Sequence, residues 1–199
     1  MFSMDFLQIF TLLTGVVYMI LEIRQKNLMW VVGILTSLAA MWVFFRQGLY
    51  ASFALNTYYF ITSFVGIWQW SQDKKLVASD IVVLNRLTFK VVILSAVVAV
   101  LGTIALSVGM ECLHGAGLLN ENPMSLLDSA IAVLSAVATW WLVKSYREQW
   151  WLWILADSLS VLLCVLQGMW WMAALYVAYV VAAVYGLRYW KKCGVYIGD

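Results

Sequence analysis

The sequence contains little charge and almost no proline. Of its 199 residues, 11% are charged and one is proline, whereas 65% are hydrophobic. Soluble domains are about 45–50% apolar and about 25% charged, so this chain is too apolar for a soluble domain. Its long, continuous apolar runs predict an all-α integral membrane protein, because a membrane β-barrel would show short alternating segments instead.

The sequence also lacks the motifs of several catalytic and metal-binding classes. Its three cysteines, Cys112, Cys164 and Cys193, have no metal-ligand spacing and form no CxxC motif. The one histidine, His114, has too few potential ligands near it in the sequence for a metal site. No nucleophile–base pair and no phosphate-binding glycine loop is recognisable. We therefore expect a protein that is not an enzyme and has no metal, cofactor or nucleic-acid partner.

Seven segments are apolar over about the 20 residues that a helical membrane span requires. They cover residues 6–21, 27–45, 49–70, 91–109, 126–143, 150–166 and 170–190. The first is expected to be a retained span and not a signal peptide, because no basic stretch precedes it. The polar connection at 71–90 is a candidate for a short interfacial helix, and residues 110–128 are predicted to form a loop.

The basic residues predict the orientation in the membrane. With seven spans, eleven lysines and arginines fall on one side, and only Arg46 falls on the other. Basic residues concentrate on the cytoplasmic side of membrane proteins. The N-terminus is therefore expected outside and the C-terminus in the cytoplasm.

An internal repeat relates the first three spans to the last three. A shift of 120 residues aligns Trp30 with Trp150 and Gly66 with Gly186. Because a single fourth span separates the two groups, both have the same orientation, which predicts two parallel three-helix repeats joined by a central fourth helix. The predicted boundaries are 5–72 for the first repeat, 73–128 for the connecting region with its span at about 91–109, 125–192 for the second repeat and 193–199 for a cytoplasmic tail.

A single carboxylate, Asp157, interrupts the sixth span. Trp150 and Trp153 precede it at helical spacing, so all three are expected on one face. A carboxylate at the centre of a membrane costs about 2.5–3.5 kcal/mol on the insertion scale and normally faces a protein interior. With two indoles beside it, Asp157 predicts a site for a flat cation. The structural alternative is that Asp157 caps a broken helix or accepts a hydrogen bond from a hydroxyl such as that of Ser158 or Ser160.

Further candidates lie on neighbouring spans. The amide of Asn56, deep in the third span, is costly unless bonded, so it either bridges helices or contacts substrate. The other candidate substrate-binding residues are Tyr59, Tyr176, Tyr179, Gln167, Trp30 and Ser37. The small residues Gly66 and Gly186 are assigned to close helix packing. Glu22, beside Arg24 and Lys26, either forms an interfacial ion pair, which is favoured, or has a role in transport.

The segment Glu148-Gln149-Trp150-Trp151-Leu152-Trp153-Ile154-Leu155-Ala156-Asp157 resembles the WxxWxxx(N/D) signature of the Pnu vitamin transporters, the PnuC family. Supporting similarity comes from Gln167-Gly168, from Leu55-Asn56-Thr57-Tyr58-Tyr59 and from Gly66-Ile67-Trp68-Gln69-Trp70, and the resemblance covers residues 5–192. It implies a homotrimer in a bacterial inner membrane that carries a non-phosphorylated vitamin by facilitated diffusion. An intracellular vitamin kinase then traps the product. Family substrates include nicotinamide riboside, thiamine and riboflavin.

The last position of the signature bears on the substrate. Nicotinamide riboside members often have asparagine there, whereas this chain has Asp157, which resembles the thiamine-type (PnuT) members. Thiamine and nicotinamide riboside are both cations, and a carboxylate attracts either one. It can also accept a hydrogen bond from the aminopyrimidine of thiamine. We therefore expect a uniporter for a cationic vitamin, with thiamine slightly ahead of nicotinamide riboside. The alternatives are a proton-coupled carrier in which Asp157 titrates, and a membrane receptor or assembly subunit without transport.

Overall fold

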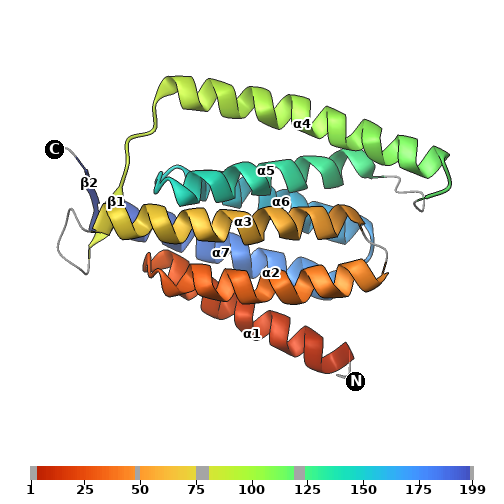
Figure 1. Cartoon of the computed structure of the whole chain (residues 1–199), viewed down its shortest axis with the longest axis horizontal. Coiled ribbons are helices and arrows are strands. Elements are labelled where there is room, and N and C mark those ends of the chain that lie inside the picture. Colours follow the sequence, from red (N-terminus) through yellow and green to blue (C-terminus); the bar gives the residue numbers. More distant parts are fainter. Residues whose placement is uncertain (1–3, 48–49, 75–80, 119–123, 198–199) are drawn as a thin grey trace. The chain divides into compact units, whose positions relative to one another are not determined.

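The computed structural model of the chain describes residues 4–47, 50–74, 81–118 and 124–197. Within these ranges it contains seven α-helices and two short strands (Figure 1). The elements are α1 (Met4–Ile23), α2 (Leu28–Gln47), α3 (Tyr50–Asp73), β1 (Val82–Leu84), α4 (Phe89–Gly115), α5 (Ser125–Val143), α6 (Gln149–Leu166), α7 (Trp170–Cys193) and β2 (Gly194–Tyr196). Each predicted span corresponds to one helix to within a few residues, except that α4 continues six residues past the predicted end at 109.

Four of these helices are long and apolar enough to cross a membrane, judged by length and composition. They are α4, α5, α6 and residues Met172–Cys193 of α7. Shorter apolar stretches occur at Thr14–Ile23 of α1 and Leu28–Ala39 of α2. α4 exposes large apolar side chains all around it, including Leu94 at 64% and Leu101 at 61%. A helix that is apolar on every face belongs in lipid or in a large core. The protein is therefore an all-helical, multi-pass membrane protein, while the seven-span count and the orientation stay predictions.

The helices belong to two compact units. Unit 1 consists of Met1–Asn85, Leu142–Arg147 and Arg188–Asp199, and unit 2 consists of Arg86–Trp141 and Glu148–Leu187. Unit 1 thus holds α1, α2, α3 and both strands, while unit 2 holds α4 and most of α5, α6 and α7. The ends of α5 and α7 next to residues 144 and 194 belong to unit 1. The predicted repeat boundaries follow the order of the sequence and stay a prediction.

The two strands form a small parallel sheet that the sequence analysis did not predict. Val82 pairs with Gly194 and Leu84 with Tyr196. All three residues of β1 are buried, and the β-branched side chains of two of them, Val82 and Val83, favour a strand. Residues 81–88 therefore contain a strand where we expected a short interfacial helix, and residues 75–80 of that connection lie outside the described residues. A Cβ at Gly194 would lie 2.4 Å from the backbone carbonyl oxygen of Trp190 and 2.4 Å from Leu84 Cδ1, so only glycine fits there.

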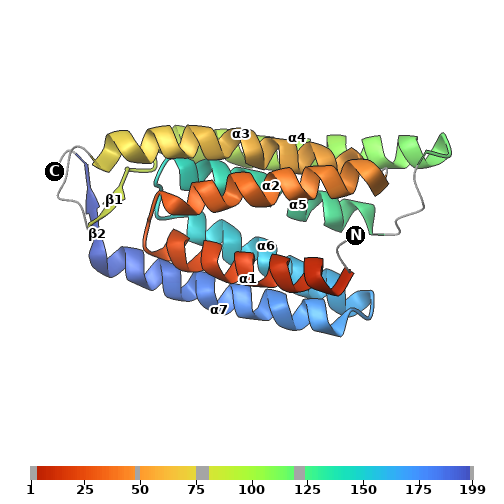
Figure 2. The ribbon, with the colours of Figure 1, turned by 60° about the horizontal axis from the view of Figure 1, so that its bottom comes forward.

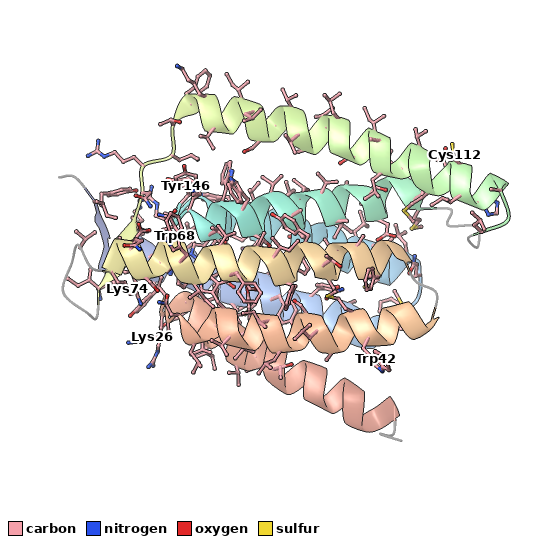
Figure 3. The ribbon with its side chains drawn as sticks, viewed as in Figure 1. Lys26, Trp42, Trp68, Lys74, Cys112 and Tyr146 are labelled. Carbon is pink, nitrogen blue, oxygen red and sulfur yellow. The ribbon has the colours of Figure 1, made fainter. Side chains whose placement is uncertain are left out.

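One buried amide attaches the turn between α1 and α2 to this sheet. Gln25 is 1% exposed. Its Nε2 donates to the carbonyl oxygen of Val83 at 2.8 Å, and the Val83 N–H donates back to Gln25 Oε1 at 2.7 Å. The Lys74 ammonium donates to the Gln25 carbonyl oxygen. Figure 3 shows Lys26 and Lys74 near the end of unit 1 that holds the turn between α1 and α2, and Trp42 toward the other end of α2. The turn, the end of α3 and β1 are thereby held together.

Two buried indoles cap helix ends in unit 1. Trp70 Nε1 donates to the carbonyl oxygen of Leu142 at 3.1 Å, and Trp190 Nε1 donates to that of Ile23 at 2.9 Å. Both acceptors lie in the last turn of a helix, where carbonyl groups have no partner within the helix. The third helix of each half therefore caps the first helix of the other half.

Candidate functional site

Asp157 is buried in the middle of α6, with 7% of its surface exposed. Trp150, Ser160 and Cys164, which share its predicted helical face, are also buried. The Trp151 side chain, on another face, is 61% exposed. The face that runs from Trp150 to Cys164 is therefore the inward face of α6, as its spacing predicts.

Neither neighbouring hydroxyl binds the Asp157 carboxylate. Ser158 Oγ donates to the carbonyl oxygen of Ile154 at 2.7 Å, and Ser160 Oγ donates to that of Ala156 at 2.9 Å. A hydroxyl has a single proton to donate, so both are occupied by the backbone. Of the structural alternative for Asp157, the hydrogen bond from Ser158 or Ser160 is therefore not found.

Two tyrosines of α7 lie near this carboxylate. The rings of Tyr176 and Tyr179 meet edge to face, with centroids 6.0 Å apart and an interplanar angle of 84°. Both phenols interact electrostatically with Asp157, and Tyr176 also interacts with Asp128 of α5. α6 and α7 are consecutive helices joined by a short turn (Figure 2). The structure therefore brings Asp157, Tyr176 and Tyr179 together within unit 2, where aromatic faces and a carboxylate suit an organic cation.

The two tryptophans of the signature have different surroundings. Trp150 is 1% exposed and lies against α7, because a Cβ at Gly186 would be 2.5 Å from Trp150 Cη2. Trp153 is partly exposed, but its Nε1 is buried and has no hydrogen-bond partner among the described residues. The Trp153 indole thus keeps a donor beside Asp157, one turn away on the same helix.

The corresponding candidates of the first half lie in unit 1. Trp30 is 1% exposed and packs edge to face on Trp70, with ring centroids 5.1 Å apart. A Cβ at Gly66 would lie 2.3 Å from Trp30 Cε2. Gly66 and Gly186 therefore have the close-packing role that their size predicts. Ser37 is buried at 4% exposure, and Tyr59 is partly buried.

Unit 1 contains a buried carboxylate that the sequence analysis assigned to the interface. Glu22 is 4% exposed, whereas Arg24 is exposed and Lys26 partly exposed, and the ion pair expected with them stays a prediction. Tyr18 interacts electrostatically with both Glu22 and Tyr59. Tyr18 precedes Glu22 by four residues and so shares its helical face, which was a usable signal for an inward position. The structure thus groups Tyr59 with Tyr18 and Glu22.

Two polar candidates, Gln167 and Asn56, lie on different units, and within unit 2 Gln167 is not brought to Asp157. Gln167 is exposed at the C-cap of α6, where Gly168 has φ +72° and the Met169 N–H donates to the Cys164 carbonyl oxygen. This glycine-terminated end is typical of α-helices and lies about three turns from Asp157. Asn56 is partly buried on α3 in unit 1. The substrate-binding roles of Gln167 and Asn56 stay predictions.

These features define a class: a helical, multi-pass membrane protein with an internal carboxylate among aromatic side chains. Comparison with known proteins then identifies the family. Residues 5–192 match the sequence model of the nicotinamide mononucleotide transporter family, and the chain belongs to that family. This confirms the resemblance to the PnuC transporters.

Individual relatives support the same family. The nicotinamide riboside transporter PnuC of Neisseria mucosa is 27% identical over 191 residues, which cover 90% of this chain and 69% of the relative. That of Escherichia coli K12 is 26% identical over 166 residues, covering 74% of this chain and 69% of the relative. A crystal structure of the vitamin B3 transporter PnuC has a TM-score of 0.68 and 27% identity, covering 92% of this chain and 79% of that one. These relatives are transporters and not enzymes, and they lend no support to thiamine.

Proposed function

We propose that the protein carries nicotinamide riboside across the membrane by facilitated diffusion. This ranks nicotinamide riboside above thiamine, which the aspartate of the signature had favoured. Both relatives compared above are named as nicotinamide riboside transporters. The aspartate discriminates weakly, because both ligands are aromatic cations and a carboxylate attracts either one.

The observation that carries the proposal is the buried carboxylate of Asp157 beside Tyr176 and Tyr179. The pyridinium ring of nicotinamide riboside is a flat cation. The faces of phenol and indole rings attract such a cation, and a carboxylate neutralises its charge. Its ribose hydroxyl groups require polar partners, which the two phenols and the Trp153 N–H can provide. A neutral passenger would leave the buried carboxylate without compensation, at a cost of several kcal/mol.

We infer that the helices form two parallel three-helix repeats joined by α4. The support is the element boundaries: a shift of 120 residues brings α1, α2 and α3 onto α5, α6 and α7 to within one residue at every end. In folds of this kind the substrate site lies between the repeats near the middle of the membrane. Transport would then proceed by rocking of the two repeats about that site.

The family and the charge distribution support a proposal for the cellular setting. We propose a homotrimer in a bacterial inner membrane, with the N-terminus outside and the C-terminus in the cytoplasm. An intracellular vitamin kinase would phosphorylate the imported riboside and so maintain the gradient. The eleven-to-one distribution of basic residues supports the orientation.

Binding to the purified protein tests the substrate. Nicotinamide riboside, thiamine and riboflavin are added separately, and the unfolding temperature is measured for each. A ligand that binds only the folded state raises this temperature, and we expect the largest rise with nicotinamide riboside. Stabilisation by thiamine alone would overturn the substrate and restore the thiamine alternative. No stabilisation by any of the three would overturn the vitamin site itself.

A further inference from the structure

We propose that Gly186 and Trp150 are a positioning pair, whose contact sets the rotation and spacing of α6 against α7 and thereby holds Asp157 beside Tyr179. The inference rests on the proposed function for its ligand, nicotinamide riboside. It separates the two tryptophans of the signature: Trp150 orients the helix, and Trp153 remains available to the substrate.

The contact leaves no room for a larger residue. A Cβ at Gly186 would lie 2.5 Å from Trp150 Cη2, 2.6 Å from Cζ2 and 2.7 Å from Cζ3. These atoms form the outer edge of the six-membered ring of the indole. Non-bonded carbon atoms are separated by about 3.5–4.0 Å at contact, so a methyl group here would force the indole or the helices apart. Packed interiors transmit such shifts because they contain little free volume.

The register of the two helices links this contact to the carboxylate. Trp150 lies seven residues before Asp157 on α6, and Gly186 lies seven residues after Tyr179 on α7. Seven residues are two helical turns, so each helix presents both of its residues on one face. Because the chain reverses between α6 and α7, the Trp150–Gly186 contact and the Asp157–Tyr179 interaction lie in one register, two turns apart. A change in helix rotation at the first pair therefore moves the second.

Trp150 has no surface to offer a ligand. It is 1% exposed, whereas Trp153 is partly exposed. A residue that stacks on a ligand needs accessible surface. By this criterion Trp153 fits substrate contact, and Trp150 fits helix positioning.

The first half supplies an internal comparison. In unit 1, Trp30 also lies against a glycine, Gly66, but with atoms at the fusion of its two rings: a Cβ there would lie 2.3 Å from Cε2 and 2.6 Å from Cδ2. The residue seven positions after Trp30 is Ser37, which has no charge. The same packing device therefore occurs without a carboxylate, so Gly66→Ala is a matched control for Gly186→Ala.

The test combines two substitutions. Gly186→Ala, Trp150→Phe and the double variant are purified, and the dissociation constant for nicotinamide riboside and the unfolding temperature without ligand are measured. Phenylalanine lacks the outer ring edge that the new methyl group would strike. We expect each single substitution to weaken binding about ten-fold or more, because binding geometry tolerates only about 0.5 Å of displacement. The double variant should bind more tightly than either single variant, since the added methyl occupies the space that the smaller ring leaves.

Gly66→Ala is the control for a general loss of stability, and its expected result differs from the results that would overturn the inference. Gly66→Ala should lower the unfolding temperature about as much as Gly186→Ala but change the dissociation constant less than about three-fold. Losses that add in the double variant would overturn the inference, because a direct ligand role for Trp150 gives no rescue. Equal loss of affinity in Gly66→Ala would also overturn it. If the unaltered protein does not bind nicotinamide riboside, the proposed function fails, and the inference falls with it unless thiamine binding shows the same rescue.

Discussion

The side-chain amide of Gln25 donates a hydrogen bond to the hydroxyl of Ser145 at 3.2 Å, which joins two residues 120 positions apart. Both have left-handed backbone, with φ +49° and +55°, and within the described ranges no other residue except glycine does. Each follows the end of the first helix of its half. Left-handed backbone costs residues with a side chain about 1–2 kcal/mol, so these two turns are held in place by their surroundings.

This relationship predicts that Gln25→Leu destabilises the protein strongly. The substitution removes the donor to Val83 and Ser145 and the acceptor of the Val83 N–H, leaving buried backbone groups unpaired. We expect a loss of about 2–4 kcal/mol, measured by denaturant unfolding of the detergent-solubilised protein. Ser145→Gly is the matched comparison. It loses two long hydrogen bonds, from the Gln25 amide at 3.2 Å and to Asp73 Oδ2 at 3.5 Å, but relieves the left-handed backbone, so its loss should be smaller. A Gln25→Leu variant as stable as the unaltered protein would contradict the assignment.

The Asp157→Asn variant should lose affinity for the cationic ligand while remaining folded. Asparagine keeps the size and hydrogen-bonding capacity of the side chain but removes its charge. A hydrogen bond to a charged group contributes about 1.5–3 kcal/mol and one between neutral groups about 0.5–1.5 kcal/mol. Because asparagine retains the neutral hydrogen bond, and the signature itself accepts asparagine here, we expect the dissociation constant for nicotinamide riboside to rise about three- to ten-fold. Isothermal titration calorimetry measures this, with the unfolding temperature as the control for folding. Undiminished affinity would show that the carboxylate does not face the ligand.

Transport is expected to be independent of a proton gradient. In liposomes that contain the protein and no kinase, nicotinamide riboside should reach equal concentrations on both sides and go no further. A protonophore should not change the initial rate of uptake. Accumulation above the external concentration that a protonophore abolishes would instead support the proton-coupled alternative, in which Asp157 binds and releases a proton during the cycle.

The two capping indoles predict a pair of equal stability effects. Trp70→Phe and Trp190→Phe each remove one hydrogen bond to a helix-end carbonyl group while retaining most of the aromatic packing. We expect each to lower the free energy of unfolding by about 1–2 kcal/mol. Trp68→Phe, at a position that is 61% exposed, is the control and should change it by less than about 0.5 kcal/mol. An effect at Trp68 as large as those at the buried positions would contradict the capping role.

The helices and the inward face of α6 could be predicted from the sequence because both depend on local patterns. Apolar length defines the helices, and the spacing from Trp150 to Cys164 defines the face. The β1–β2 sheet could not be predicted, because its two three-residue strands lie more than 100 residues apart and carry no periodic signal. The burial of Glu22 at 4% exposure could not be predicted, because its sequence neighbours Arg24 and Lys26 suggested a position at the membrane interface; the ion pair itself stays a prediction.

The capping indoles and the parallel strands also have a consequence for biosynthesis. Unit 1 begins with α1, but Trp70 requires Leu142, the Ile23 carbonyl group requires Trp190, and β1 requires β2. A ribosome supplies these partners only near the end of translation. The first three helices therefore lack these partners until the second half of the chain has been synthesised, and loss of residues 188–197 would remove the partners of the Ile23 carbonyl group and of β1.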